Sequence, residues 1–223
     1  MCNSLIDNYD LFIFDLDDTL IKTENYHYVA WLTVLKEVKN DNFNIDFNTF
    51  CSKFHSNKEN NIKTYLLDEL NITNYDKIIE KKNRLYLEII KKESEKIELL
   101  EGAFDFLNKI INNNKKFVIV SNSLKNNVDF FTSVFPILQK SSKNYYRELF
   151  TNKKPNPECY LKVVDDFPNH KMIGFEDSIT GIHAMTLVNS IDTIFINNKN
   201  YYYYNFIITN YNINKTIINY VNL

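Results

Sequence analysis

Three acidic side chains stand directly after a short apolar segment near the start of the chain. Leu11–Phe14 reads as a buried strand, and Asp15, Asp17 and Asp18 follow it. Acids at the carboxyl end of a buried strand in an α/β sheet lie where ligands bind. Two carboxylates this close repel each other unless a cation or a proton lies between them. The segment is therefore a candidate magnesium and phosphate site, and a solvated acidic turn is the simpler interpretation.

Three more polar clusters occur later in the chain. Ser121-Asn122-Ser123 follows the apolar segment 117–120, and Glu176-Asp177-Ser178 follows the apolar segment 172–175, with Gly181 shortly after it. Lys153-Lys154-Pro155 lies between these two clusters. In a parallel sheet the carboxyl ends of the strands share one edge, which would gather carboxylates, hydroxyls and a lysine. Each cluster taken alone could be an ordinary turn, a solvated loop or a helix cap.

Strands and helices must position these clusters. From residue 103 onward, apolar strand patterns alternate with helical patterns, which predicts a parallel sheet covered on both faces. Between the first strand and this part of the chain, only helical patterns occur. The predicted strands are 11–14, 117–120, 172–175 and 193–196, and the predicted helices are 24–39, 46–55, 60–70, 74–96, 103–112, 128–135, one that includes 160–164, and 179–187.

The predicted fold class is therefore α/β, with a doubly wound parallel sheet and an inserted helical domain. Residues 1–21 and 98–223 would form the α/β core domain. Residues 22–97 would form a helical cap domain, inserted after the first strand.

Composition narrows the class of protein further. The chain has 223 residues, 44% of them hydrophobic, and a net charge of −2. This length allows one core domain with a smaller insert. The near-neutral charge gives no electrostatic reason to expect a nucleic-acid partner. No apolar stretch approaches a membrane span, no signal-peptide pattern is present, and the cysteines lack metal-ligand spacing. We expect a soluble, cytoplasmic monomer.

The four polar clusters, in this order, resemble the haloacid dehalogenase superfamily of phosphotransferases with an α-helical cap. The matching motifs are Asp15-Leu16-Asp17-Asp18-Thr19, Ser121-Asn122-Ser123, Lys154-Pro155, and Glu176-Asp177-Ser178 with Gly181. They span nearly the whole predicted core. The resemblance implies a Rossmann-like core and hydrolysis of a phosphate ester through an aspartyl-phosphate.

The resemblance also implies catalytic roles for four residues. Asp15 would be the nucleophile that attacks phosphorus. Asp17 would protonate the leaving oxygen and then activate the water that hydrolyses the intermediate. Ser121 would donate a hydrogen bond to the phosphoryl group, and Lys154 would offset its charge. We prefer Lys154 to Lys153 because the lysine of the family directly precedes the proline.

Mg²⁺ is the implied cofactor, because it prefers hard oxygen ligands and keeps several waters. Asp15, the backbone carbonyl of Asp17, and Asp177 would hold the ion. Glu176 would orient a metal-bound water. The ion would also screen the repulsion between the nucleophilic carboxylate and an anionic phosphate.

The cap is expected to select the substrate. Its first helix resembles the β-phosphoglucomutase-like and phosphoglycolate phosphatase-like subfamily, through Thr23 and the run from His27 to Ala30 and Trp31. Lys82-Asn83 with Tyr86 also resembles that subfamily. For His27, the alternative is a partly buried structural histidine. The candidate substrate-binding residues are Thr19, Asn122, His27 and Lys82.

Two departures favour a phosphatase over a mutase. Thr19 stands where the mutases usually carry Val, and the mutase arginine motif is missing near 51–58, where Lys53 or Lys58 could replace it without bidentate geometry. We therefore expect a Mg²⁺-dependent phosphatase of a small phosphorylated metabolite, with a sugar phosphate as the favoured substrate. Nucleoside monophosphates, phosphoglycolate and glycerol phosphate stay open. The alternatives are a phosphosugar mutase and a non-catalytic binding protein.

Overall fold

The computed structural model describes residues 5–54, 59–197, 204–221 and 223. Two compact units divide the chain: Met1–Lys22 with Glu98–Leu223, which we call the core, and Thr23–Ile97, which we call the cap. The segments where the chain leaves and re-enters the core lie side by side. Ile21 forms an antiparallel bridge with Leu99, and the Lys22 N–H donates to the Glu98 carbonyl at 3.0 Å.

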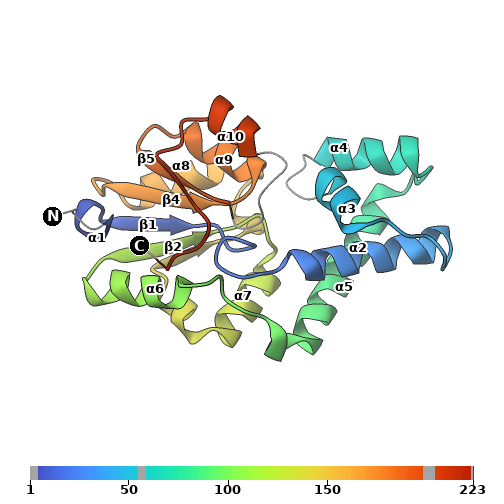
Figure 1. Cartoon of the computed structure of the whole chain (residues 1–223), viewed down its shortest axis with the longest axis horizontal. Coiled ribbons are helices and arrows are strands. Elements are labelled where there is room, and N and C mark those ends of the chain that lie inside the picture. Colours follow the sequence, from blue (N-terminus) through green and yellow to red (C-terminus); the bar gives the residue numbers. More distant parts are fainter. Residues whose placement is uncertain (1–4, 55–58, 198–203, 222) are drawn as a thin grey trace. The chain divides into compact units, whose positions relative to one another are not determined.

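A six-stranded parallel sheet forms the centre of the core (Figure 1). The strand order is β3-β2-β1-β4-β5-β6, and each neighbouring pair is parallel. The strands are β1 (Leu11–Phe14), β2 (Lys116–Val120), β3 (Lys143–Tyr145), β4 (Met172–Glu176), β5 (Ile191–Ile196) and β6 (Lys215–Ile217). In the register, Phe14 lies beside Ile119 and Phe175. The predicted parallel sheet is confirmed, and the carboxyl ends of β1, β2 and β4 share one edge.

Helices cover both faces of this sheet (Figure 1). Because side chains alternate along a strand, Leu11 and Ile13 face one side while Phe12 and Phe14 face the other. The first pair packs with residues of α8 and α9, and the second pair packs on Phe106 of α6. The helices of the core are α1 (Leu5–Asn8), α6 (Ala103–Asn112), α7 (Lys125–Val134), α8 (Glu158–Asp166), α9 (Ile179–Thr186) and α10 (Tyr204–Asn210), with 3₁₀ turns η3 (Pro136–Lys140) and η4 (Arg147–Leu149). The doubly wound, Rossmann-like class predicted from the sequence is confirmed.

Aromatic rings fill the core on the second face, beside β1. Phe14 stacks on Phe175 with ring centroids 4.7 Å apart, and Phe106 stacks on Tyr220 at 5.6 Å. Tyr220 is buried, and its hydroxyl donates to the backbone carbonyl of Thr19 at 3.0 Å. The last part of the chain therefore packs into the core and supports the loop that follows β1.

Tyr220→Phe is expected to lower the free energy of unfolding by about 1–3 kcal/mol, because the buried Thr19 carbonyl loses its donor while the ring keeps its packing. Urea denaturation measures the difference. Tyr9→Phe is the matched control, since the Tyr9 hydroxyl donates to Asp192 at 2.6 Å in a partly buried position. Loss of the Tyr9 bond should lower the free energy of unfolding by less. Equal decreases in the two variants would contradict the importance assigned to burial of the Tyr220 bond.

The described residues of the cap are mainly helical. Its elements are α2 (Glu24–Lys39), α3 (Phe47–Lys53), α4 (Glu59–Thr64), the π-helical turn η1 (Tyr65–Glu69), α5 (Tyr75–Lys92) and the 3₁₀ turn η2 (Ser94–Lys96). The long helices α2 and α5 pack against each other. Trp31, Val34 and Leu35 of α2 form a buried cluster with Ile78 of α5. The cap therefore has a hydrophobic core of its own.

Some elements differ from the sequence prediction. The segment predicted as one helix over 60–70 is α4 followed by the π-helical η1, and the helix predicted from 128 begins at Lys125. β3, β6 and α10 are absent from the sequence prediction. β3 and β6 have only three residues each, and both begin with a lysine, so neither shows an apolar strand pattern.

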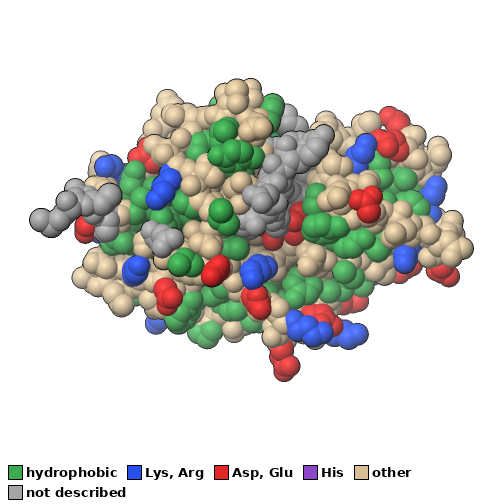
Figure 2. All heavy atoms as spheres, in the orientation of Figure 1, with side chains coloured by type: hydrophobic (Ala, Val, Ile, Leu, Met, Phe, Trp, Pro, Cys, Tyr) green, Lys and Arg blue, Asp and Glu red, His purple; other side chains and the backbone are tan. Residues whose placement is uncertain are grey.

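The surface carries charges of both signs. Figure 2 shows acidic and basic side chains interspersed on the visible face, as expected for a chain with a net charge of −2. Among the described residues, every helix is too short or too polar to cross a membrane.

Candidate active site

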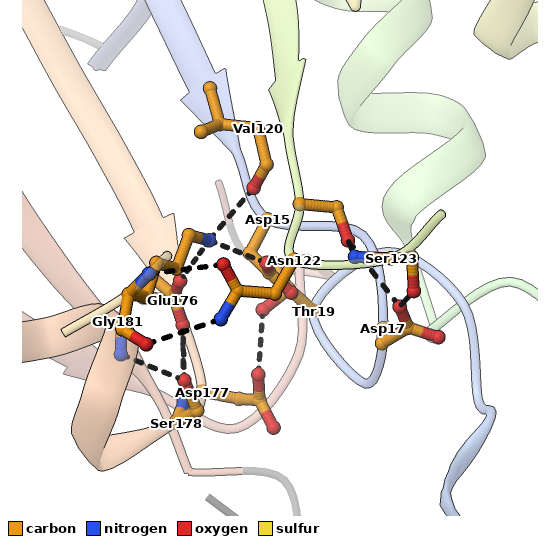
Figure 3. A network of polar contacts seen from close by, with 12 residues as sticks. Asp15, Asp17, Thr19, Val120, Asn122, Ser123, Glu176, Asp177, Ser178 and Gly181 are labelled. Atoms are coloured by element: carbon orange, nitrogen blue, oxygen red, sulfur yellow. Dashed lines mark hydrogen bonds and ion pairs between the residues drawn. The ribbon is translucent and has the colours of Figure 1, made fainter. Parts of the chain in front are cut away.

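The loop after β1 places Asp15 and Asp17 just beyond the sheet (Figure 3). The Asp15 N–H donates to the Phe175 carbonyl at 3.0 Å, so that Asp15 extends the pairing with β4. Asp18 has a left-handed backbone with φ of 57°, a conformation that Asp adopts more readily than most residues. The Asp18 N–H then donates to the Ile21 carbonyl at 2.7 Å. A tight turn therefore follows the two carboxylates and returns the chain toward the cap.

Lys154 joins the acids of two different strands. It lies in the loop between η4 and α8, and its side chain is 2% exposed. Its Nζ donates to Asp15 Oδ1 at 2.7 Å, to Glu176 Oε1 at 2.6 Å and to the Val120 carbonyl at 2.8 Å. All three donor positions of the ammonium group are used. Lys154 therefore holds the ends of β1, β2 and β4 together.

Burial and charge act against each other in this ion pair. Burial raises the pKa of Asp15 well above its ordinary 3.8; Lys154 opposes the rise, and Glu176 and Asp17 add to it. Burial lowers the pKa of Lys154, but the charges of Asp15 and Glu176 outweigh it and hold this pKa well above 10.5. Lys154 is therefore protonated, and a cation bound beside Asp15 would favour its ionised form.

The Glu176 carboxylate is fully buried and held on both oxygens. Oε1 accepts from Lys154 and from the Tyr160 hydroxyl at 2.9 Å. Oε2 accepts from the Ser178 N–H at 3.2 Å and from the Ser178 hydroxyl at 3.0 Å. The Ser178 oxygen also accepts from the Gly181 N–H at 3.0 Å and so caps α9. Glu176 is therefore fixed by protein donors, which suits the orienting of a neighbour better than direct metal binding.

Gly181→Ala is expected to displace this carboxylate. A β-carbon at residue 181 would overlap the carboxyl group of Glu176, which its four donors hold in place. We expect a loss of activity and a fall of roughly 1–3 kcal/mol in the free energy of unfolding, the scale of overpacking in a core.

Gly174→Ala is the control for Gly181→Ala. Its added carbon would overlap the end of the buried Met185 side chain and lie 3.2 Å from Ile191 Cγ2, so its closest contacts are core side chains. Phosphate release and thermal melting compare the two variants. Similar activity in both would contradict the need for a fixed Glu176.

Asp177 completes a group that could hold a metal ion. Asp15, Glu176 and Asp177 are all buried, and each offers a carboxylate oxygen within 4.8 Å of the others. The Thr19 hydroxyl donates to Asp177 Oδ1 at 3.0 Å and so orients this carboxylate. Oxygen donors at this spacing fit a small, hard cation such as Mg²⁺. Thr19, predicted to bind substrate, therefore bonds to one of the three acids that could hold a metal ion.

The residues after β2 reach the same edge of the sheet. The Ser121 hydroxyl lies 3.5 Å from Asp17 Oδ2 and accepts from the Ser123 N–H at 2.9 Å. Asn122 bonds to the backbone of Lys154 in both directions: its Oδ1 accepts from the N–H at 3.1 Å, and its Nδ2 donates to the carbonyl at 3.3 Å. The structure thus shows Asn122 anchoring the Lys154 loop, a contact that the sequence does not predict.

The two cap candidates lie together within the cap. Lys82 is buried, and its Nζ lies 2.9 Å from His27 Nδ1. The His27 ring stacks on Tyr86 with centroids 3.9 Å apart. With Lys82 protonated, Nδ1 accepts and the proton of a neutral His27 lies on Nε2. Of the two lysines considered for a distal phosphate, Lys53 pairs with Glu69 at 2.6 Å, and Lys58 lies outside the described residues.

A comparison with protein-family models identifies the family of the chain. A family model described as haloacid dehalogenase-like hydrolase matches residues 12–196. The chain belongs to the haloacid dehalogenase-like hydrolases. The family resemblance carried by the four motifs is thereby confirmed, and the protein is an enzyme of the haloacid dehalogenase type.

Three solved structures share the fold. A family IA, variant 3 hydrolase from Entamoeba histolytica aligns with a TM-score of 0.77 and 23% identity, over 95% of this chain and 93% of that one. CbbY from Rhodobacter sphaeroides, solved with phosphate, gives 0.76 and 15%, over 96% of each chain. A β-phosphoglucomutase from Clostridium difficile gives 0.72 and 24%, over 95% and 92%. At these identities the likeness is one of fold.

Sequence reasoning assigned no individual role to two residues that contact this site, Ser123 and Tyr160. Ser123 donates to Asp17 Oδ2 at 2.5 Å (Figure 3). Its place in the Ser121-Asn122-Ser123 motif was the only signal that the sequence offered for it. Tyr160 reads as a core residue of an amphipathic helix, and nothing in the sequence marks its hydroxyl as a partner of Glu176.

Proposed function

We propose that this hydrolase is a Mg²⁺-dependent phosphatase of a small phosphorylated metabolite, with a sugar phosphate as the favoured substrate. The observation that carries the proposal is the buried Asp15 carboxylate, bound to Lys154 beside Asp177 and followed two residues later by Asp17. A carboxylate in this setting can act as a nucleophile, and a second one nearby can transfer protons.

The proposed reaction has two steps. In the first, an Asp15 oxygen attacks phosphorus, the bond from phosphorus to the leaving oxygen breaks, and Asp17 gives its proton to that oxygen. In the second, the Asp17 carboxylate takes a proton from water, whose oxygen attacks phosphorus. The bond between Asp15 and phosphorus breaks, and inorganic phosphate leaves. Asp17 ends protonated, ready for the next ester.

The neighbouring groups supply charge and hydrogen bonds. Lys154 would offset negative charge on Asp15 and on the phosphoryl oxygens. Ser121 would donate to a phosphoryl oxygen, while Asn122 would keep the Lys154 loop in place through its two backbone bonds.

Mg²⁺ would be held by Asp15, by Asp177 and by the backbone carbonyl of Asp17, with Glu176 orienting a bound water. The buried oxygen donors of the site support this assignment. When bound, the ion supplies positive charge that stabilises the transferring phosphoryl group.

Phosphate release from a panel of phosphate esters tests the activity. The panel contains sugar phosphates, nucleoside monophosphates, phosphoglycolate and glycerol phosphate, each with Mg²⁺, and compares the wild type with Asp15→Asn. We expect release from one class of ester by the wild type alone. Equal release by both proteins would contradict the proposed nucleophile.

Removal of Mg²⁺ by a chelator is expected to reduce activity roughly 100-fold or more, since a metal ion supplies several kcal/mol of charge stabilisation in such reactions. Mg²⁺ should also raise the melting temperature, because a ligand of the native state stabilises it. Asp177→Asn should abolish this rise. The exposed Asp165→Asn is the control and should keep it. Full activity in excess chelator would refute the metal assignment.

A phosphosugar mutase is the second candidate, and the His27–Lys82 pair favours it. This pair gives the cap a buried polar group able to bind a sugar hydroxyl or phosphate. A β-phosphoglucomutase is among the solved structures that share the fold. A mutase would transfer phosphate to a second hydroxyl before water reaches the intermediate. Interconversion of sugar-phosphate isomers after priming with a bisphosphate, without phosphate release, would favour it.

A further inference from the structure

Two serine hydroxyls lie near Asp17, and the closer of the two belongs to Ser123. The Ser123 hydroxyl donates to Asp17 Oδ2 at 2.5 Å (Figure 3). The Ser121 hydroxyl lies 3.5 Å from the same oxygen. A hydroxyl–carboxylate bond of 2.5 Å is at the short end of the range for charge-assisted hydrogen bonds. Of the two serines, Ser123 is therefore the stronger partner of Asp17.

The backbone fixes Ser123 in this position. Its N–H donates to the Ser121 hydroxyl at 2.9 Å, and its carbonyl accepts from the Arg147 N–H at 3.0 Å. The Ser121 N–H in turn donates to the Tyr145 carbonyl at 2.8 Å, which continues the pairing of β2 with β3. The hydroxyl of Ser123 thus stands on a backbone that is anchored at both of its polar groups.

This bond distinguishes the two oxygens of the Asp17 carboxyl group. While Oδ2 accepts from Ser123, Oδ1 is the oxygen that can carry a proton toward the substrate. The bond also restricts rotation of the carboxyl group, which otherwise turns freely about its terminal torsion. Both effects hold Asp17 in one orientation for proton transfer.

We propose that Ser123 is a positioning residue, which orients Asp17 so that its proton is directed from Oδ1 to the leaving oxygen. The proposal rests on the proposed function, because it assigns Asp17 the role of general acid. Ser123 acts through Asp17 and need not touch the substrate.

Substrates with different leaving groups test the proposal. An alkyl phosphate from the panel releases a poor leaving group that needs protonation, whereas p-nitrophenyl phosphate releases a stable phenolate that does not. We compare kcat/KM, which covers only the steps up to release of the alcohol. Because Ser123→Ala removes a hydrogen bond to a charged group, we expect it to lower kcat/KM about 10- to 100-fold for the alkyl ester. For the aryl ester we expect less than about a threefold loss.

Three further variants isolate the hydroxyl. Ser123→Thr keeps a donor and should restore most of kcat/KM for the alkyl ester. Ser123→Cys keeps the volume with a weak donor, should behave like Ser123→Ala, and replaces it if the alanine variant fails to fold. Ser133→Ala is the matched control, because the exposed Ser133 hydroxyl donates to the Phe130 carbonyl of its own helix. It should leave kcat/KM unchanged for both esters.

Asp17→Asn, assayed with the same two esters, distinguishes the positioning role of Ser123 from the general-acid role of Asp17. If Asp17→Asn loses far more activity on the alkyl ester but Ser123→Ala and Ser123→Cys lose equally on both, the role of Ser123 is overturned and the general acid stands. If Asp17→Asn itself loses equally on both esters, the general acid of the proposed function is overturned, and the positioning role falls with it.

Discussion

Asp15→Asn is expected to abolish turnover while leaving the protein folded. An amide cannot form the aspartyl-phosphate, and removal of a covalent nucleophile costs on the order of 10⁶-fold elsewhere. The side chain keeps nearly the same shape, and its carbonyl oxygen can still accept from Lys154, which donates to Asp15 Oδ1 at 2.7 Å in the wild type. Steady-state phosphate release measures the loss, and intact-protein mass spectrometry shows whether a phosphorylated enzyme still forms.

The stability of Asp15→Asn should differ from the wild type in a pH-dependent way. Burial raises the pKa of Asp15 well above 3.8 in the folded protein, so between the unfolded and folded values the native state binds more protons than the unfolded chain. Wild-type stability therefore falls as pH rises through that window. The amide does not titrate, so without Mg²⁺ the variant should lack this fall. Thermal melting between pH 4 and 8 compares the two proteins.

Two outcomes would contradict the role of Asp15. Wild-type turnover in a folded Asp15→Asn protein would exclude it as the nucleophile. A phosphorylated protein detected in the variant would place the nucleophile on another residue. Asp165→Asn is the matched control, since it makes the same chemical change at an exposed position of α8.

Asp17→Asn is expected to lower turnover by roughly 10²- to 10⁴-fold, the usual contribution of a general acid or base. Both proposed steps need Asp17, but an aryl phosphate needs it only in the second. With p-nitrophenyl phosphate we therefore expect a rapid burst of nitrophenol followed by slow turnover, because the phosphoenzyme forms faster than it is hydrolysed. Stopped-flow absorbance measures the burst.

The asparagine should keep the local structure in this experiment. Its carbonyl oxygen can accept from the Ser123 hydroxyl, as Asp17 Oδ2 does at 2.5 Å. A loss below about threefold in steady-state turnover would refute the proton-transfer role. A large loss without a burst would place the defect in the first step alone.

The sequence predicts the central strands of the sheet and the edge at which the acidic residues gather, for a physical reason. Leu11–Phe14 and the buried part of β4 are continuous apolar runs that end in acids, and a buried parallel strand leaves exactly such a pattern where it meets the ligand edge. The helix at 103–112 was predicted to the residue, because apolar side chains recur on one face between Gly102 and the polar run that follows Asn112.

Contacts that depend on three-dimensional packing were not predictable. The Tyr220 hydroxyl reaches the Thr19 carbonyl only because the end of the chain returns to the loop after β1. The Asn122 side chain pairs with the Lys154 backbone across a long separation in sequence. β3 and β6 are edge strands of three residues, held by neighbours more than by their own pattern. Local periodicity carries no information about such long-range partners.

The central position of β1 has a consequence for how the chain folds during synthesis. β1 precedes both of its partner strands in the chain, since they begin only at Lys116 and Met172. At about 5–20 residues per second, the ribosome leaves Leu11–Phe14 without its second partner for on the order of ten seconds. In that interval the cap, Thr23–Ile97, is complete and can fold on its local contacts. The apolar first strand keeps at least one open edge during that interval and is then prone to mispairing, so a change that slows the docking of β4 should lower the cellular yield more than an equally destabilising change in the cap.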